Sequence, residues 1–311
     1  MKKKKLFSTI IISMFFMFLF SSTAFANSGV TYVEGVDARG IVLKDINCPI
    51  EVTCEKLTFN IPDFVDNFWN TEIEEYSLNA VAEYTFYNPA DYTVTATLLF
   101  PLGSIPDYFN FEYTVADNLD KYTVSVNGED TDKKIKYSIV EGKFNFKKDS
   151  AKIMDEAVSD IDTDIMPWYE YEITLEPNET VVNTVSIPLF PGQNSEYEPE
   201  IYDFTYLLSP AKTWSKFGTL DVVINTSYYL VDSSEKFQKT ENGYETHFDS
   251  LPDDELKFKI CESETPDRDL MYVLRPVLMI LYIIFNVIIV SFAIHLMIKG
   301  IRRIKKRRTT K

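Results

Sequence analysis

The chain has 311 residues, of which 47 are acidic and 31 are Lys or Arg, so its formal net charge is −16. We do not expect so acidic a chain to bind nucleic acid, because phosphate groups need a basic protein surface. All the acidic residues lie between Asn27 and Asp269. At 45% hydrophobic residues overall, the chain is long enough to bury a sizeable core in this segment.

Residues 1–26 predict a secretory signal peptide. Lys2–Lys5 are basic, Leu6–Phe20 is apolar, and Ala24–Ala26 has the small residues of a cleavage site. The alternative is an uncleaved N-terminal anchor. Cleavage before Asn27 would leave the new N-terminus outside the cell.

Residues 27–148 and 167–269 are predicted to be two β regions. Apolar and polar side chains alternate in Leu78–Tyr87 and again in Tyr92–Phe100, and the turn residues between them predict a β-hairpin. Many short strands with turns of Asn, Gly, Pro and Asp indicate a mainly β fold. We therefore predict an antiparallel β-sandwich-type ectodomain, built as one large or two small sandwiches.

Residues 149–166 are predicted to form a helical, acidic linker between the two β regions. Apolar residues recur there at helical spacing between Ile153 and Ile161. The segment also carries Asp160, Asp162 and Asp164, whose alternate carboxylates make a weak candidate for a calcium site. A solvated linker without metal is the alternative, and we expect no other cofactor.

The three cysteines are Cys48, Cys54 and Cys261, so at least one thiol is unpaired in a monomer. If the chain between Cys48 and Cys54 is extended, these two residues are roughly 20 Å apart. A disulfide needs Cα atoms within about 7 Å, so a bridge between them requires a turn. Both a disulfide and free thiols therefore remain open.

Residues 276–298 form a nearly unbroken apolar run, PVLMILYIIFNVIIVSFAIHLMI, which predicts one C-terminal transmembrane helix. As a helix the run is about 34 Å long, enough to cross a hydrocarbon layer of about 30 Å. The basic tail at 299–311, KGIRRIKKRRTTK, predicts a cytoplasmic C-terminus. Together with the signal peptide, these features predict a single-pass type I protein of the cell membrane, in contact with the lipid bilayer.

Asn286 lies near the middle of the apolar run. Lipid cannot satisfy the donors and acceptor of its amide. This residue therefore predicts a contact with a membrane-protein partner or with a second copy of the chain. The alternative is a tolerated single polar residue.

Catalytic motifs are hard to find in this sequence. His295 lies in the apolar run, and His247 lies in an alternating segment typical of a surface strand. The sequence contains no nucleophile-elbow, zinc-peptidase, P-loop or dinucleotide motif. We accordingly predict that the chain is not an enzyme.

Three segments carry a resemblance: AEYTFYNPADYTVTATLLFPLG, LEPNETVV and YLLSPAKTWSKFGTLDVVINT. With them the chain resembles an uncharacterised family of bacterial secreted or membrane-anchored proteins, over about residues 45–230. The resemblance implies a signal peptide, a β-rich ectodomain and often a C-terminal anchor. It implies no active site, because the shared motifs are turns and strand faces.

These features predict a membrane-anchored extracytoplasmic β-module, a non-enzymatic protein that binds a partner or belongs to the cell envelope. The alternative is an accessory or sensing subunit of a membrane complex, coupled through its transmembrane helix. The basic tail is too short to hold a catalytic domain, so signalling would need a second protein.

Overall fold

The structure is a computed structural model that describes residues 32–45, 47–61, 77–103, 119–140, 153–155 and 164–308. The chain divides into two compact units. One of them, Tyr32–Asp267, contains nearly all the strands and is called the β unit below. The other unit contains the C-terminal helix. The predicted signal peptide at 1–26 lies outside the described residues.

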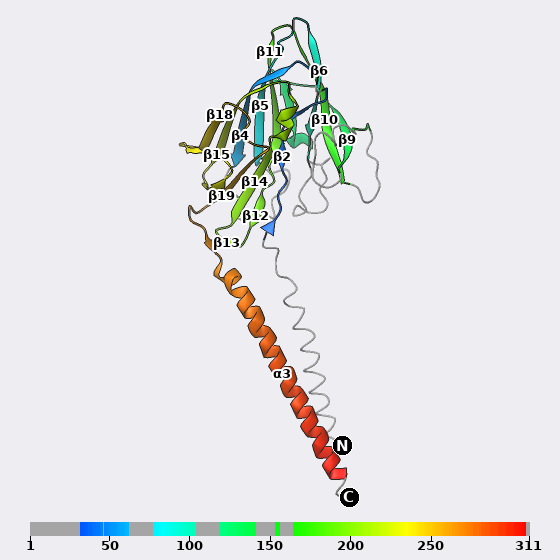
Figure 1. The fold of residues 1–311 in the computed structure, drawn as a ribbon, viewed down its shortest axis with the longest axis vertical. Helices are drawn as coiled ribbons and strands as arrows, with labels where there is room; N and C mark the ends of the chain where they lie inside the picture. Colours follow the sequence, from blue (N-terminus) through cyan, green and yellow to red (C-terminus); the bar gives the residue numbers. More distant parts are fainter. Residues whose placement is uncertain are drawn as a thin grey trace. The chain divides into compact units, whose positions relative to one another are not determined.

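The largest sheet of the β unit has eight strands in the order β17-β18-β15-β4-β5-β11-β7-β8 (Figure 1). Its strands are β4 (Glu51–Ile61), β5 (Asn79–Tyr87), β7 (Thr123–Val126), β8 (Glu129–Asp130), β11 (Thr180–Pro188), β15 (Phe217–Thr226), β17 (Gln238–Lys239) and β18 (Gly243–Phe248). Strands from both predicted β regions pair directly here, since β4 lies beside β15 and β5 beside β11.

A six-stranded sheet has the path β1-β12-β14-β19-β16, and β2 also pairs with β14. Its strands are β1 (Tyr32–Val33), β2 (Ala38–Arg39), β12 (Gly192–Asn194), β14 (Ile201–Leu207), β16 (Tyr229–Ser233) and β19 (Glu255–Cys261). A four-stranded sheet follows the order β3-β6-β10-β9, from β3 (Val42–Leu43), β6 (Val94–Pro101), β9 (Lys134–Val140) and β10 (Asp164–Leu175). The short strands β13 (Tyr197–Glu198) and β20 (Asp267–Arg268) and the 3-10 helix η5 (Ser209–Thr213) complete the described elements before the C-terminal helix.

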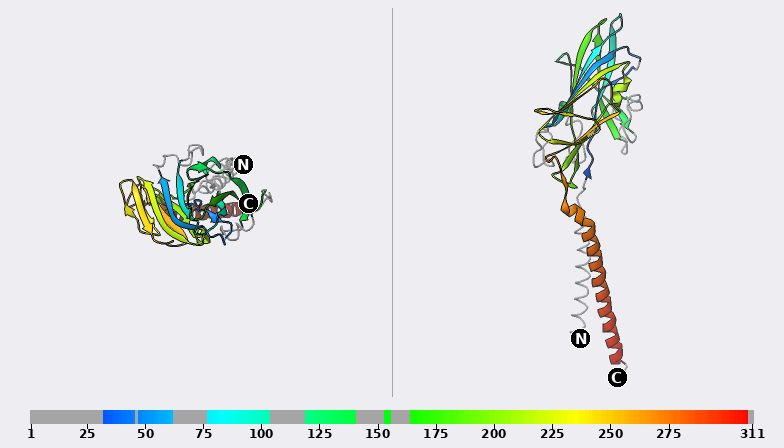
Figure 2. Two further views of the ribbon diagram at one scale, coloured as in Figure 1. Left: turned by 90° about the horizontal axis from the view of Figure 1, so that it is seen from above. Right: turned by 60° about the vertical axis from the view of Figure 1, so that its left-hand side comes forward.

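The predicted mainly β, sandwich-type fold is confirmed. Among the described strands, the pairings within these three sheets are antiparallel, apart from two parallel ones, β4 with β15 and β2 with β14. The eight-stranded and six-stranded sheets face one another (Figures 1 and 2), and aromatic side chains from both pack together in one core. Phe59 of β4 lies 4.9 Å from Phe258 of β19 and 6.1 Å from Tyr206 of β14, measured between ring centroids.

The predicted hairpin between β5 and β6 is wrong, although both strands form. β5 pairs with β4 and β11, whereas β6 pairs with β3 and β10 in another sheet. The connection is held by the buried Asn88, whose amide donates to the carbonyl oxygens of Leu175 at 3.1 Å and Tyr92 at 2.9 Å. The bond to Tyr92 closes the connection itself and the bond to Leu175 ties it to the end of β10, so the buried amide is satisfied where the chain passes from one sheet to the next.

Most of the predicted helical linker at 149–166 lies outside the described residues. Where it is described, Met154 forms an isolated antiparallel bridge with Tyr137, and β10 already begins at Asp164. These described positions are extended rather than helical.

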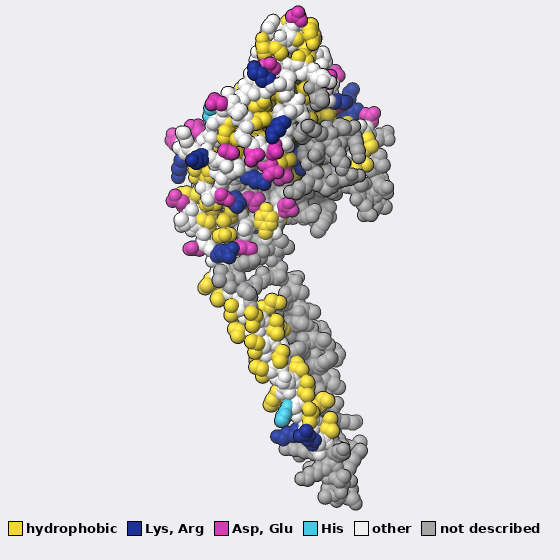
Figure 3. All heavy atoms as spheres, in the orientation of Figure 1, with side chains coloured by type: hydrophobic (Ala, Val, Ile, Leu, Met, Phe, Trp, Pro, Cys, Tyr) yellow, Lys and Arg dark blue, Asp and Glu magenta, His cyan; other side chains and the backbone are white. Residues whose placement is uncertain are grey.

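The C-terminal helix α3 spans Leu270–Arg308. Its segment Val277–Arg302 has 26 residues with a mean hydropathy of 2.8, so it is long and apolar enough to cross a membrane. Apolar side chains cover the visible face of this segment in Figure 3. The prediction of one C-terminal apolar helix is confirmed.

A glycine permits the parallel pairing of β15 with β4. A Cβ atom on Gly218 would lie 2.0 Å from the carbonyl oxygen of Thr53, at the point where the β4 register shifts against β5. We expect Gly218→Ala to lower the free energy of unfolding by about 1–3 kcal/mol, because backbone cannot yield as a flexible side chain can. Chemical denaturation followed by circular dichroism measures this. Gly300→Ala is the control, since nothing lies within 4 Å of that position, and equal stability of the two variants would contradict the prediction.

Candidate functional site

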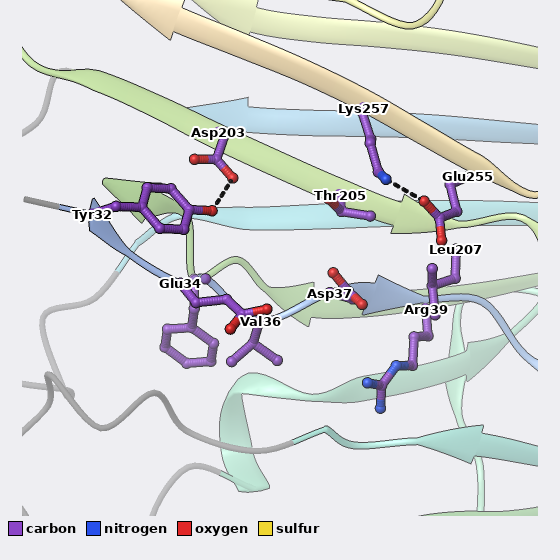
Figure 4. Close-up of a pocket in the computed structure, with 12 residues that line it drawn as sticks. Tyr32, Glu34, Val36, Asp37, Arg39, Asp203, Thr205, Leu207, Glu255 and Lys257 are labelled. Carbon is purple, nitrogen blue, oxygen red and sulfur yellow. Dashed lines mark hydrogen bonds and ion pairs between the residues drawn. The ribbon is translucent and has the colours of Figure 1, made fainter. Parts of the chain in front are cut away.

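A recess of about 480 Å³ lies on the face of the six-stranded sheet that points away from the core (Figure 4). Its floor comes from β14 and β19, and the N-terminal segment 32–39 forms its wall. The side chains that give it polar character are Tyr32, Glu34, Asp37, Arg39, Asp203, Thr205, Glu255 and Lys257.

Strand alternation places the floor residues. In β14, Phe204 and Tyr206 point into the core, so Asp203 and Thr205 point to the opposite face. The register of β14 with β19 sets Thr205 beside Lys257. Because Phe204 and Tyr206 are buried in the core, the alternate residues Asp203 and Thr205 line the recess.

Backbone pairing holds the wall. β1 pairs with β12, and β2 lies parallel to β14 with Ala38 opposite Tyr206. Between these strands, the Val36 amide donates to the carbonyl oxygen of Phe190 at 2.8 Å. The carboxylates of Glu34 and Asp37 therefore stand on a segment attached at both ends.

Acidic groups outnumber basic ones in the recess. Four carboxyl groups, from Glu34, Asp37, Asp203 and Glu255, share it with the cations of Arg39 and Lys257. Lys257 forms an ion pair with Glu255, and Tyr32 donates a hydrogen bond of 3.1 Å to Asp203. The recess consequently has an excess of negative charge.

The surroundings make these negative charges costly. Desolvation in the recess raises the pKa of Asp37 and of Asp203 above the usual aspartate value. The hydrogen bond from Tyr32 partly opposes this at Asp203. Desolvation, followed by the charge of Asp203, also raises the pKa of Tyr32 to about 12. A bound cation would offset the cost of ionising these desolvated groups.

All three cysteines have free thiols. Cys48 and Cys261 are buried, and burial raises the pKa of each thiol. Cys54 lies in the extended strand β4 on the outer face, with its sulfur 3.7 Å from Oδ2 of Asp221. The extended backbone of β4 removes the turn that a bridge from Cys48 to Cys54 would need.

Of the proposed calcium ligands, Asp160 and Asp162 lie outside the described residues, and Asp164 is the first residue of β10. Within the described ranges, no three His, Cys, Asp or Glu side chains are grouped closely enough to hold a metal ion. The calcium site therefore stays a prediction.

Asn286 and His247 each have partners within their own unit. The Asn286 side-chain nitrogen donates to the carbonyl oxygen of Tyr282, one turn earlier in α3, at 2.8 Å. His247 lies on the exposed strand β18, where Nδ1 is 2.6 Å from Asp221, and this hydrogen bond raises the pKa of His247. The contact of Asn286 with a partner helix remains a prediction.

The recess escaped the sequence analysis. Acidic and basic residues at the outward positions of β14 and β19 were a detectable signal. Segment 32–39 has no such pattern, and the sequence does not show that it lies across these two strands.

No family model matches the chain, and no curated protein matches it. Among solved structures, the fold is similar to a protein of Legionella pneumophila described provisionally as nutrient binding, at 13% identity and a TM-score of 0.49. That match covers 75% of this chain and 73% of the other. The predicted resemblance to an uncharacterised bacterial family thus gains no family assignment.

Two further matches correct a prediction. An M1 zinc metallopeptidase of Deinococcus radiodurans matches 68% of this chain and 39% of its own, at 13% identity and a TM-score of 0.26. A single-substitution variant of an M1 zinc metallopeptidase from the same organism matches at 12% identity and a TM-score of 0.24, covering 71% and 40%. The prediction that the chain is not an enzyme is contradicted by this finding, and we withdraw it. It rested on missing short motifs, whereas active sites are assembled by tertiary structure.

A test of the recess follows from its unfavourable charge. Asp203→Asn keeps an oxygen that can accept from Tyr32 and removes the desolvated charge. The pKa of Asp203 is raised in the folded state. The free energy of unfolding of the wild type therefore falls as the pH rises from the ordinary aspartate pKa through this raised pKa. We expect the variant to be more stable than wild type by less than about 1 kcal/mol near about pH 8, and equally stable near about pH 3.

Denaturant unfolding at the two pH values measures this difference. Asp130→Asn, on the exposed edge strand β8, is the matched control and should change stability at neither pH. A loss of stability in Asp203→Asn near the higher pH would contradict the view that the Asp203 charge is costly in the recess.

Proposed function

We propose that this protein is a membrane-anchored extracytoplasmic binding module whose recess takes a small organic cation. The observation that carries the proposal is the excess of carboxyl groups in the recess, of which Asp37 and Asp203 are desolvated. Replacing water around such groups by a fixed positive charge is favourable, since it lowers the cost of their ionisation.

The size of the recess favours an organic ligand over a bare ion. Its volume of about 480 Å³ falls in the range of small-molecule sites, roughly 300–1,000 Å³. Asp37 and Glu34 both stand on the wall (Figure 4), and the charge of Glu34 acts on Asp37, so we place the ammonium group of the ligand at this pair. Thr205 on the floor offers a hydrogen bond to a polar group elsewhere on the same ligand.

We also propose that the protein is located in the cell membrane. The apolar segment of α3 would cross the cell membrane once, with the basic tail in the cytoplasm and the β unit outside after signal cleavage. The resemblance to bacterial membrane-anchored proteins supports this orientation.

Thermal unfolding of the full chain in detergent tests ligand binding. The probes are ethanolamine, putrescine and choline, each compared with an uncharged alcohol of similar size. We expect at least one ammonium probe to stabilise the β unit, by about 2.7 kcal/mol at 100 times its Kd, and its alcohol to have no effect.

The variant Glu34→Gln with Asp37→Asn should lose this stabilisation, because it removes both wall charges. Glu245→Gln, on the exposed face of β18, is the control and should keep it. Equal shifts from the charged and uncharged probes, or an unchanged response of the double variant, would overturn the cation site.

A second candidate function is that of an accessory or sensing subunit of a membrane complex. Asn286 favours it, because its hydrogen bond to Tyr282 uses one amide donor, and among the described residues no partner is seen for its oxygen, which could accept from another helix. Such a contact between helices contributes about 0.6 kcal/mol on average, enough to select a partner or a register.

Asn286→Leu tests this candidate. We expect the variant to insert normally and to lose self-association, or a co-purifying membrane partner, in a FRET or mild-detergent pull-down assay. Ser291→Ala, a milder polar change in the same helix, is the control. Unchanged association of Asn286→Leu would remove the support for a helix contact.

A further inference from the structure

A carboxyl group is buried in the core of the β unit, directly behind the recess. Glu55 of β4 is 1% exposed and lies opposite Tyr84 of β5, which is also 1% exposed. From the facing sheet, the Tyr206 hydroxyl donates to Oε1 of Glu55 at 3.2 Å. The hydroxyl groups of Tyr206 and Tyr84 are 3.1 Å apart, so the three side chains form one connected cluster.

The surroundings of Glu55 are almost free of charge. The titratable groups acting on it are Tyr84 from β5 and Tyr206 from β14. Its neighbour on β15 is the apolar Leu220. Within the described part of the chain, no Lys, Arg or His forms an ion pair with Glu55, and a buried carboxylate without a cation is costly.

A buried carboxylate avoids the free-energy cost of its charge by binding a proton. Burial raises the pKa of Glu55 to about 7, and the hydrogen bonds from the two tyrosines only partly oppose the shift. Glu55 is therefore neutral below that pH and acquires a charge above it.

The cluster is connected to the wall of the recess. A Cβ atom on Gly40 would lie 2.5 Å from the Tyr84 hydroxyl and 3.0 Å from that of Tyr206, so this backbone rests directly on the cluster. Gly40 follows Arg39, which lines the recess. Tyr206 itself is flanked in β14 by Thr205 and Leu207, which also line it.

We propose that Glu55, Tyr84 and Tyr206 form a pH-responsive latch that holds residues 38–40, at the C-terminal end of the wall, against β14 when Glu55 is protonated. Loss of the proton places a charge under the wall, and the wall opens to let water reach it. The inference rests on the proposed function in one respect, since it adds a control to the same recess.

The sign of the pH effect follows from linkage. The folded-state pKa of Glu55, about 7, exceeds the ordinary value of 4.5 that applies when the group is exposed. The stabilisation is therefore complete below the ordinary value and is lost as the pH rises through about 7. If opening the wall exposes Glu55, protection should fall about thirtyfold between about pH 5.5 and about pH 8.5.

Hydrogen exchange of the full chain in detergent tests this, after correction for the intrinsic pH dependence of exchange. In wild type, amides of segment 38–43 should lose protection by that factor at the higher pH. In Glu55→Gln, which is neutral at every pH, protection should be the same at both. Glu245→Gln, an exposed acid on β18, should behave like wild type.

Tyr206→Phe provides a second test that does not depend on the folding of Glu55→Gln. It removes a hydrogen bond that lowers the pKa of Glu55, so the transition should move to higher pH. Constant protection in wild type, a retained pH dependence in Glu55→Gln or an unmoved transition in Tyr206→Phe would overturn the latch. No ligand is used, so the result is separate from whether the recess binds a cation.

Discussion

The contact between the eight-stranded and six-stranded sheets determines most of the other features of the β unit. Phe59 packs edge-on against both Phe258 and Tyr206, and Phe204 stacks on Phe258 with centroids 5.0 Å apart. Burial of these rings fixes the direction of the neighbouring side chains in the same strands, because successive side chains point to opposite faces of a sheet. Asp203 and Thr205 must then face away from the core, where they line the recess.

The same contact explains why a polar cluster lies inside the core. Tyr206 buries its ring against Phe59 and carries its hydroxyl to Glu55, so one residue contributes both apolar area and a hydrogen-bond donor. Gly40 leaves room for the hydroxyl groups where the wall crosses them. The core and the recess thus lie on the two faces of one strand, β14.

Ionisation is costly at both acidic sites of the folded chain. The carboxyl groups of Asp37 and Asp203 are desolvated in the recess, and Glu55 is desolvated in the core. Apolar residues in these places would be less costly, and unfavourable ionisable groups of this kind often mark functional positions. The recess and the Glu55 cluster share strand β14, through Asp203 and Tyr206. For this reason we propose that the cluster controls the recess.

The sequence by itself determined the class of the fold and the apolar C-terminal helix, because alternation in β5 and the unbroken apolar run before Lys299 are local patterns. Only the tertiary structure decided which strands are partners. β5 and β6 looked like a hairpin, yet Asn88 sends them to different sheets through bonds with residues far along the chain. The recess and the Glu55 cluster likewise join segments more than 100 residues apart, as Tyr206 and Glu55 show with a separation of 151. Such contacts depend on long-range packing, which no local pattern records.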